Sequence, residues 1–163
     1  MSELAALAVR LDRLESIEAI RRLVATYAQG ADRRNDPAIM RPLFADDAVW
    51  EAAGFSRFDG GDAIAEGISA IARDQITWSL HYMVSPHITL AEDGESARCH
   101  WYLWELCAMR DEAGVSRDTW LGGWYDSSLR RTAQGWCFSH VRLDLRLVSP
   151  NDLPWTGKVT LDD

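Results

Sequence analysis

Hydrophobic residues in the first third of the chain recur at steps of three and four, the period of an α-helix. Residues 3–13 predict a short helix, and Ser16 is expected to cap a second one. The apolar stripe of this second helix is formed by Ile17, Ile20, Leu23, Val24, Tyr27 and Ala31. Pro37 predicts the start of a third short helix that ends near Phe44, because proline suits the first helical position. A further amphipathic pattern predicts a helix at 61–75.

In the second half of the chain the pattern changes to the alternation that is typical of β-strands. Residues 79–114 predict a long hairpin with its turn at 92–95, and residues 115–148 predict a second hairpin with its turn near 133–135. A short strand is also expected at 48–52. Helices that precede a run of antiparallel strands indicate an α+β fold, in which the helices pack on one face of the sheet.

The length of 163 residues is that of one domain. We expect this domain to span residues 1–148. The remaining segment, 149–163, contains two prolines and little periodicity, so a C-terminal coil tail is predicted there.

The predicted strands carry large side chains on both faces. In the segment 98–109, one face presents Arg98, His100, Tyr102, Trp104 and Leu106, and the other presents Cys99, Trp101, Leu103, Glu105 and Cys107. An antiparallel sheet that met water on one side would have one clearly polar face. We therefore expect the helices to cover one face and a second subunit to cover the other, giving a homotrimer or homodimer. Glu105 is the exception on its apolar face, and a β-bulge that turns it outward is expected.

Composition excludes several classes of function. The net charge of −8 argues against nucleic-acid binding, which requires clustered Lys and Arg. No stretch approaches the ~20 apolar residues of a membrane span, and the N-terminus lacks the basic leader of a signal peptide. The three cysteines, Cys99, Cys107 and Cys137, form no C-x-x-C motif and are interpreted as reduced core residues. A cytoplasmic protein is expected.

The chemistry available to this chain is acid–base chemistry by histidine and carboxylates. The sequence has no phosphate-binding or dinucleotide-binding glycine motif, no nucleophile elbow and no zinc helix, so neither a metal nor an organic cofactor is expected. His81 is a candidate on the face of its strand that also carries Met83. His100 and His140 are weaker candidates, because each has an arginine beside it on its own face.

Asp32 lies at the end of the second predicted helix, two residues after Gly30, which is expected to end or bend that helix. At ~100° per residue, Asp32 lies roughly 120° from the centre of the apolar stripe. Helical spacing alone therefore leaves a solvated Asp32 at least as plausible as a buried one. Tyr27 lies on the stripe itself, and its hydroxyl requires a polar partner there.

The chain resembles the nuclear-transport-factor-2-like, or SnoaL-like, superfamily over nearly its whole length. The resemblance is carried by the order of elements, by "LFADDAVWE" at 43–51 and by "YDSSLRRTAQGWCFSHVRL" at 125–143. It implies a cone-shaped α+β roll, also called cystatin-like, with N-terminal helices packed on a curved antiparallel sheet.

Two shorter segments, "GADRRND" at 30–36 and "LHYMVSPHI" at 80–88, are similar to the scytalone dehydratase-like branch of this superfamily. That branch includes bile-acid dehydratases and a hexachlorocyclohexane dehydrochlorinase. The resemblance implies a catalytic dyad of Asp32 and His81, with Asp32 pointing inward. A neutral His81 would act as the base, Asp32 would orient it, and Tyr27 would polarise a carbonyl or protonate a departing hydroxyl. No metal or organic cofactor is implied.

An apolar pocket between helices and sheet is expected, and it suits a small cyclic or polycyclic ligand. Its lining is predicted to include Trp50, Tyr102, Trp104 and Tyr125. The favoured hypothesis is a cofactor-independent lyase or isomerase.

Two alternative functions stay open. The first is a non-catalytic ligand-binding or assembly protein, because the same fold serves as the small (beta) subunit of aromatic-ring-hydroxylating dioxygenases. The second is epoxide hydrolysis by an Asp–Arg–Asp set, for which Asp118, Arg130 and Asp144 offer the residue types.

Overall fold

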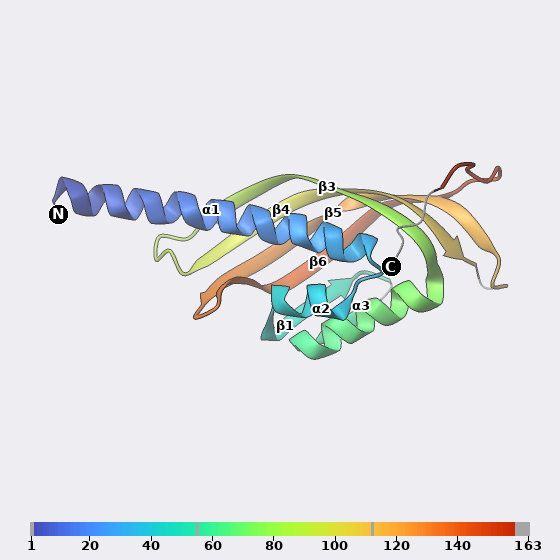
Figure 1. The fold of residues 1–163 in the computed structure, drawn as a ribbon, viewed down its shortest axis with the longest axis horizontal. Helices are drawn as coiled ribbons and strands as arrows, with labels where there is room; N and C mark the ends of the chain where they lie inside the picture. The colour runs from blue at the N-terminus through green and yellow to red at the C-terminus, as the bar shows by residue number, and fades with distance from the viewer. Residues whose placement is uncertain (1, 55, 112, 159–163) are drawn as a thin grey trace.

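The structure is a computed structural model that describes residues 2–54, 56–111 and 113–158. The helical elements are α1 (Glu3–Asp32), α2 (Pro37–Met40), the 3-10 turn η1 (Arg41–Leu43) and α3 (Gly61–Gln75). The strands are β1 (Phe44–Ala52), β2 (Ser56–Asp59), β3 (Ile76–Leu90), β4 (Ser96–Arg110), β5 (Ser116–Thr132) and β6 (Gly135–Pro150). They confirm the expected α+β fold, with helices on one side of a curved sheet (Figure 1).

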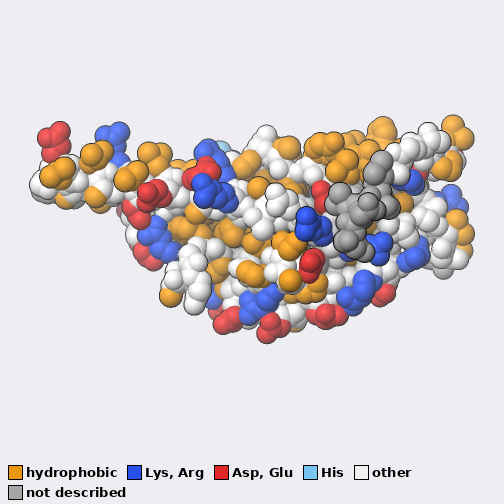
Figure 2. Space-filling model, viewed as in Figure 1, with side chains coloured by type: hydrophobic (Ala, Val, Ile, Leu, Met, Phe, Trp, Pro, Cys, Tyr) orange, Lys and Arg blue, Asp and Glu red, His pale blue; other side chains and the backbone are white. Residues whose placement is uncertain are grey.

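The N-terminal segment forms one helix of 30 residues, and the prediction of two helices is wrong. Ser2 caps α1 by accepting a hydrogen bond from the amide of Ala5. The hydroxyl of Ser16 donates to the carbonyl oxygen of Asp12 one turn earlier, so Ser16 lies within the helix. The N-terminal half of α1 extends beyond the sheet (Figure 1), and Figure 2 shows its exposed hydrophobic side chains.

Gly30 lies inside α1 and does not end the helix, contrary to expectation. Its lack of a side chain matters for packing instead. A Cβ atom at this position would lie 2.4 Å from the sulfur of Met40, which is fully buried. The absent side chain lets α2 pack directly against the last turns of α1. The helix therefore continues to Asp32 and carries that residue to the sheet.

The six strands form one sheet in the order β2-β1-β6-β5-β4-β3. β1 runs parallel to β6, and all other neighbouring pairs are antiparallel, so the sheet is mixed rather than purely antiparallel. The pattern did not predict β2. Its Phe58 stacks on Trp50 and lies over Gly67 of α3, where a side chain would clash with the ring.

The core lies between the helices and the inner face of the sheet, which α1 contacts through β3 and β6. Its largest fully buried side chains include Trp101, Phe138, Ile20, Met40 and Ile64. The outer face of the sheet also carries large apolar side chains, but these are exposed: Leu80, Tyr82, Val84, Tyr102, Trp104, Trp120 and Leu147. The expected two-sided pattern is therefore present, and the oligomer that would cover this face stays a prediction.

Candidate functional site

Asp32 and His81 meet where the end of α1 crosses β3. The Nδ1 atom of His81 lies 2.9 Å from Oδ1 of Asp32, and the backbone amide of His81 donates to the same oxygen at 2.8 Å. One carboxylate oxygen thus fixes both the ring and the backbone of His81. The exposed fractions of the two side chains are 25% for Asp32 and 9% for His81. Asp32 is therefore turned toward the sheet, which helical spacing had left open.

The loop that follows Asp32 at the end of α1 is anchored to α3. Arg34 and Asn35 both adopt left-handed backbone conformations, with φ of 57° and 53°. Such conformations are costly for residues other than glycine and require support from their surroundings. The side-chain amide of Asn35 supplies it by donating to the carbonyl oxygen of Ile68 in α3.

Glu105 is the third member of the site, and the prediction that a bulge turns it outward is wrong. β4 pairs regularly with β3 and β5 around this residue, and Glu105 lies directly opposite His81. Neighbours across strands share a face. The Glu105 side chain is therefore buried beside the ring, with Oε2 3.3 Å from Nε2 of His81. Within the described residues, its second oxygen, Oε1, has no hydrogen-bond partner.

Two carboxylates therefore hold the two ring nitrogens of His81. Burial disfavours the charged ring, but the negative charge of Glu105 and the hydrogen bond of Asp32 outweigh it and raise the pKa of His81 to about 9. The two carboxylates therefore favour the protonated ring, whereas the family resemblance implied a neutral ring that acts as the base.

Tyr27 lies in the core, as its place on the apolar stripe predicted. Its oxygen accepts a hydrogen bond from Nε1 of Trp50 at 2.9 Å. Burial raises the pKa of Tyr27 to about 12, although hydrogen bonds with Trp50 and Tyr125 act in the opposite direction. The phenol therefore keeps its proton at neutral pH, but Tyr27 is buried in the core and is not among the residues that border the cleft beside His81.

The four residues predicted to line a pocket are divided between the two faces of the sheet. Trp50 and Tyr125 are buried on the inner side, both beside Tyr27. Tyr102 and Trp104 are exposed on the outer face, and none of the four borders the cleft beside His81, so the predicted lining is corrected. The reason is strict alternation along β4: no bulge separates them from Trp101 and Glu105, which point inward.

A cleft of about 1260 Å³ adjoins the Asp32–His81 pair. It is bordered by the loop after α1, the end of α3, the first half of β3 and residues 155–158. The wall includes Trp78 and Trp155, whose rings lie 6.4 Å apart. Neither residue was among the predicted lining: Trp78 lies at the start of β3, and Trp155 lies in the tail, which was expected to be coil.

The tail is held against the sheet by Asp118, which is buried. The amide of Trp155 donates to this carboxylate, and Lys158 forms an ion pair with it. The strand β6 ends at Pro150, one residue past the expected start of the tail at Ser149. The amide of Asn151 also donates to the carbonyl oxygen of Asp118, and residues 155–158 form part of the cleft wall.

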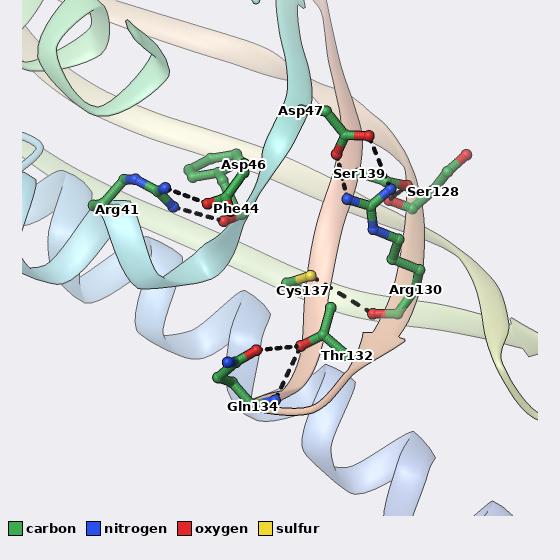
Figure 3. A network of polar contacts seen from close by, with 10 residues as sticks. All are labelled: Arg41, Phe44, Asp46, Asp47, Ser128, Arg130, Thr132, Gln134, Cys137 and Ser139. Carbon is green, nitrogen blue, oxygen red and sulfur yellow. Dashed lines mark hydrogen bonds and ion pairs between the residues drawn. The ribbon is translucent and has the colours of Figure 1, made fainter. Parts of the chain in front are cut away.

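The residues considered for epoxide hydrolysis do not come together. Arg130 forms an ion pair with Asp47 of β1. Figure 3 shows this ion pair beside Ser128 and Ser139. Asp118 binds the tail, and Asp144 lies near Arg142 and Arg146. The Asp–Arg–Asp hypothesis is therefore abandoned. In the described part of the chain, no three His, Cys, Asp or Glu side chains are grouped so as to hold a metal ion.

Two further histidine–carboxylate pairs lie away from the cleft. His100 contacts Asp126 at 2.8 Å on the outer face, and His140 contacts Glu51 at 2.9 Å. Each of these rings binds one carboxylate, whereas the ring of His81 binds two.

Comparison with known proteins identifies similar folds. A family model described as the SnoaL-like domain matches residues 12–142. No curated protein matches the chain. In the described residues, no helix is long and apolar enough to cross a membrane.

Three solved structures illustrate the likeness. A putative aromatic ring hydroxylase from Novosphingobium aromaticivorans is 24% identical, with a TM-score of 0.73 over 85% of this chain and 94% of that one. A hexachlorocyclohexane dehydrochlorinase, LinA-type3, from Novosphingobium barchaimii is 19% identical, with a TM-score of 0.81 over 91% and 99%. A putative scytalone dehydratase from Novosphingobium aromaticivorans is 17% identical, with a TM-score of 0.73 over 93% and 98%.

Proposed function

The chain belongs to the SnoaL-like domain family, and from this premise we propose that it is a cofactor-independent lyase or isomerase. The observation that carries the proposal is the hydrogen bond between Asp32 and His81 on the wall of a cleft. The substrate is a cyclic, largely apolar small molecule. The resemblance to the SnoaL-like superfamily is confirmed, and a putative scytalone dehydratase is among the solved structures of similar fold.

In this proposal His81 removes a proton next to a carbonyl or a leaving group. Asp32 binds Nδ1, which orients the ring and stabilises the imidazolium that the proton transfer forms. Tyr27 keeps its proton at neutral pH and serves as the hydrogen-bond donor to a carbonyl oxygen.

The cleft supports the proposed class of substrate. The rings of Trp78 and Trp155 offer flat apolar surfaces to a cyclic molecule, and Ile76 and Leu106 add aliphatic contacts. The names of two structural neighbours, a dehydrochlorinase and a putative dehydratase, are those of elimination enzymes. At 19% and 17% identity these likenesses establish only the fold, so the proposal rests on the site.

The test is turnover of cyclic β-hydroxy ketones, because their dehydration gives conjugated enones that absorb in the ultraviolet. We expect the wild-type protein to eliminate water from at least one member of such a panel and a chelator to leave the rate unchanged. His81→Ala should lower the rate by ~10²–10⁴-fold. His100→Ala, which alters a similar pair on the outer face, is the matched control and should keep the wild-type rate. Activity that survives His81→Ala overturns the mechanism.

The alternative function is a non-catalytic ligand-binding or assembly role, like that of the small subunit of aromatic-ring-hydroxylating dioxygenases. The observation that favours it is the exposed apolar outer face, a surface suited to another subunit. Binding of the whole panel without turnover by any of its members would support this role. A cytoplasmic location remains an expectation in either case.

A further inference from the structure

The first half of α1 carries a line of exposed leucines. Leu4, Leu7, Leu11 and Leu14 follow one another at steps of three, four and three residues, and each is more than half exposed. We call these four residues the leucine stripe. Their spacing is that of positions a and d of a heptad repeat, through which two helices pair in a coiled coil. Figure 1 shows that α1 begins beyond the sheet, and Figure 2 shows hydrophobic side chains on the surface of this part.

The leucine stripe faces away from the rest of the domain. At ~100° per residue, it lies on the order of 180° from Ile20, which is fully buried on the core side of α1. Contacts next to the stripe agree with this direction. Arg13 donates to the carbonyl oxygen of Ala91, and Asp12 forms an ion pair with Arg131. The side of α1 that meets the domain is thus occupied, so a partner that covers the leucines has to come from outside the domain.

Two charged residues beside the stripe indicate what this partner is. With Leu4 and Leu11 at position a, Arg10 is at position g and Glu15 at position e, the two positions that flank the seam. Neither forms an ion pair within the described part of the chain, and neither has an opposite charge three or four residues away along the helix. In two parallel helices, position g of one lies beside position e of the next heptad in the other. Arg10 of each copy of α1 would then meet Glu15 of the other copy.

We propose that the leucine stripe is a homodimer contact, in which it pairs in parallel with the same stripe of a second copy of the chain. Each leucine then lies opposite its own counterpart across a two-fold axis, so the surface is complementary to itself. An antiparallel pair that aligns the leucines would bring the two copies of Arg10 together, and such like-charge contacts cost free energy. The two domains lie on opposite sides of the helix pair, because each stripe faces away from its own domain.

The length of the stripe determines the strength and the place of this contact. The next positions a and d after Leu14 are Glu18 and Arg21, so the apolar seam ends there. Two heptads bury less surface than the interfaces of stable dimers, so the contact is weak and forms at high protein concentration. Leu14 lies roughly 27 Å from Asp32 along the helix. The contact therefore leaves the cleft and the outer sheet face free, and it is independent of the proposed function.

A lipid surface fits the stripe less well than a second copy does. Helices that lie on membranes carry an excess of Lys and Arg on their polar face. Around the stripe, Glu3, Asp12 and Glu15 accompany Arg10 and Arg13, so both signs of charge are present. The partner proposed is therefore a second copy of the chain, and lipid binding is tested separately.

The first test is analytical ultracentrifugation of the Trp104→Glu protein from ~1 µM to ~1 mM. This background weakens any contact through the outer sheet face, so association through α1 is measured by itself. We expect monomers at the lowest concentration and dimers at the highest. Leu7→Glu, added to this background, buries a charge in the seam and should raise the dissociation constant at least ~10-fold. Val9→Glu is the matched control, because Val9 is exposed on the opposite side of the same segment, and should leave the constant unchanged.

Circular dichroism of each variant establishes that α1 is intact. All of these residues are exposed, so we expect the variants to fold as the parent does. Monomers over the whole concentration range overturn the proposal. A dimer that Leu7→Glu and Val9→Glu weaken equally overturns it as well.

Cross-linking decides between the parallel and antiparallel arrangements. The three native cysteines are buried, so a cysteine introduced on the surface reacts alone. In the parallel dimer, Leu11 lies opposite Leu11 of the partner subunit, and Leu11→Cys should form a disulfide-linked dimer on oxidation. Val9→Cys should not. If Leu7→Cys and Leu11→Cys cross-link with each other in a mixture and neither does so alone, the parallel arrangement is wrong.

Exchange of charges tests the pairing of Arg10 with Glu15. Arg10→Glu should weaken the dimer ~2–10-fold, because two carboxylates then face each other in each of the two pairs. Glu15→Arg should do the same with two guanidinium groups. The double variant restores opposite charges and should return the dissociation constant to that of the parent. A double variant that is as weak as the single ones contradicts this pairing.

Sedimentation with vesicles of anionic phospholipid tests the lipid surface. The wild-type protein should stay in the supernatant. Vesicle binding that Leu7→Glu abolishes and Val9→Glu keeps, together with a monomer at ~1 mM, would overturn the proposal and assign the stripe to a lipid surface. None of these measurements uses turnover, so their outcome is separate from success or failure of the proposed elimination.

Discussion

Two histidine–carboxylate pairs lie on neighbouring strands of this sheet, one on each face. His81 of β3 lies on the inner face against Asp32, and His100 of β4 lies on the outer face against Asp126. The distances are nearly equal, at 2.9 Å and 2.8 Å. The exposed fractions differ, at 9% for His81 and 34% for His100, whose partner is 59% exposed.

The two pairs have nearly the same hydrogen-bond distance but different surroundings. Their chemical properties therefore differ because of burial and neighbouring charges, not because of the hydrogen bond itself. Water screens the exposed pair, which is worth ~0.2–1 kcal/mol in stability. The inner pair is removed from water and receives a second carboxylate, and these carboxylates raise the pKa of His81 above its ordinary value. The inner pair alone also adjoins the cleft.

The largest effect on the elimination rate is expected from removing the negative charge of Asp32. Asp32→Asn keeps the shape of the side chain but loses the charge that stabilises the imidazolium, so elimination should slow by up to the ~10²–10⁴-fold expected for His81→Ala. Asp126→Asn is the matched change on the outer face and should keep the wild-type rate. Steady-state kinetics on both proteins decides the matter. Equal losses in the two variants would contradict the contrast between the faces.

The second prediction concerns the stability of the two faces. Trp101 is fully buried, stacked on Tyr125, whereas Trp104 is 39% exposed on the opposite side of the same strand. Trp101→Ala should lower the free energy of unfolding by ~3–5 kcal/mol, because it leaves a large cavity. Trp104→Ala should cost much less in the separated subunit. Urea denaturation measures both, and similar losses would show that the outer face is buried in solution.

The parts of the fold that could be predicted are those fixed by local pattern. Residues 61–75 form α3 as expected, and the turn between β3 and β4 lies where the glycine-containing segment indicated. The continuous α1 and the parallel pairing of β1 with β6 were missed, since both depend on distant contacts. Gly30 is an example. Its role became clear only from the packing of Met40 against it, and Met40 lies in another element.

The site was predictable to a smaller degree. Spacing along the helix left Asp32 undecided, and only the family resemblance implied that it points inward. Glu105 was misjudged because strand alternation gives a face but not the residue opposite, and here the opposite residue is His81. Trp155 was missed because its place depends on Asp118, 37 residues earlier in the chain.

The third prediction is that a second copy of the chain covers the outer face. The residues exposed there include Tyr82, Tyr102 and Trp104, and the interface should bury more than ~1,000 Å² in total. Light scattering at micromolar concentration should give the mass of a dimer or trimer. Trp104→Glu should shift the mass toward that of a monomer, because a charge would be buried in the interface. A wild-type monomer would remove the argument for an oligomer.

The fourth prediction uses the raised pKa of His81. Because the folded value, about 9, exceeds the ordinary value of 6.5, the proton stabilises the fold fully below 6.5, and this contribution is lost as pH rises through 9. The advantage in unfolding free energy of wild type over His81→Gln should therefore shrink with rising pH, by at most a few kcal/mol. Denaturation at several pH values tests this. A constant difference would mean that the ring is not held as an imidazolium.

The smallest effect is expected from a single hydroxyl group. Tyr27→Phe removes the acceptor of the Trp50 indole, which is then left buried without its partner, so stability should fall by ~1–3 kcal/mol. The elimination rate should also fall, by less than in Asp32→Asn, because a donor to the substrate is lost while the base remains. Tyr102→Phe is the matched change on the outer face and should alter stability by no more than ~0.5 kcal/mol. Thermal denaturation and kinetics on the same two variants separate the roles of Tyr27. A Tyr27→Phe protein that is less stable but reacts at the wild-type rate would leave Tyr27 as a packing residue and assign the donor role to another group.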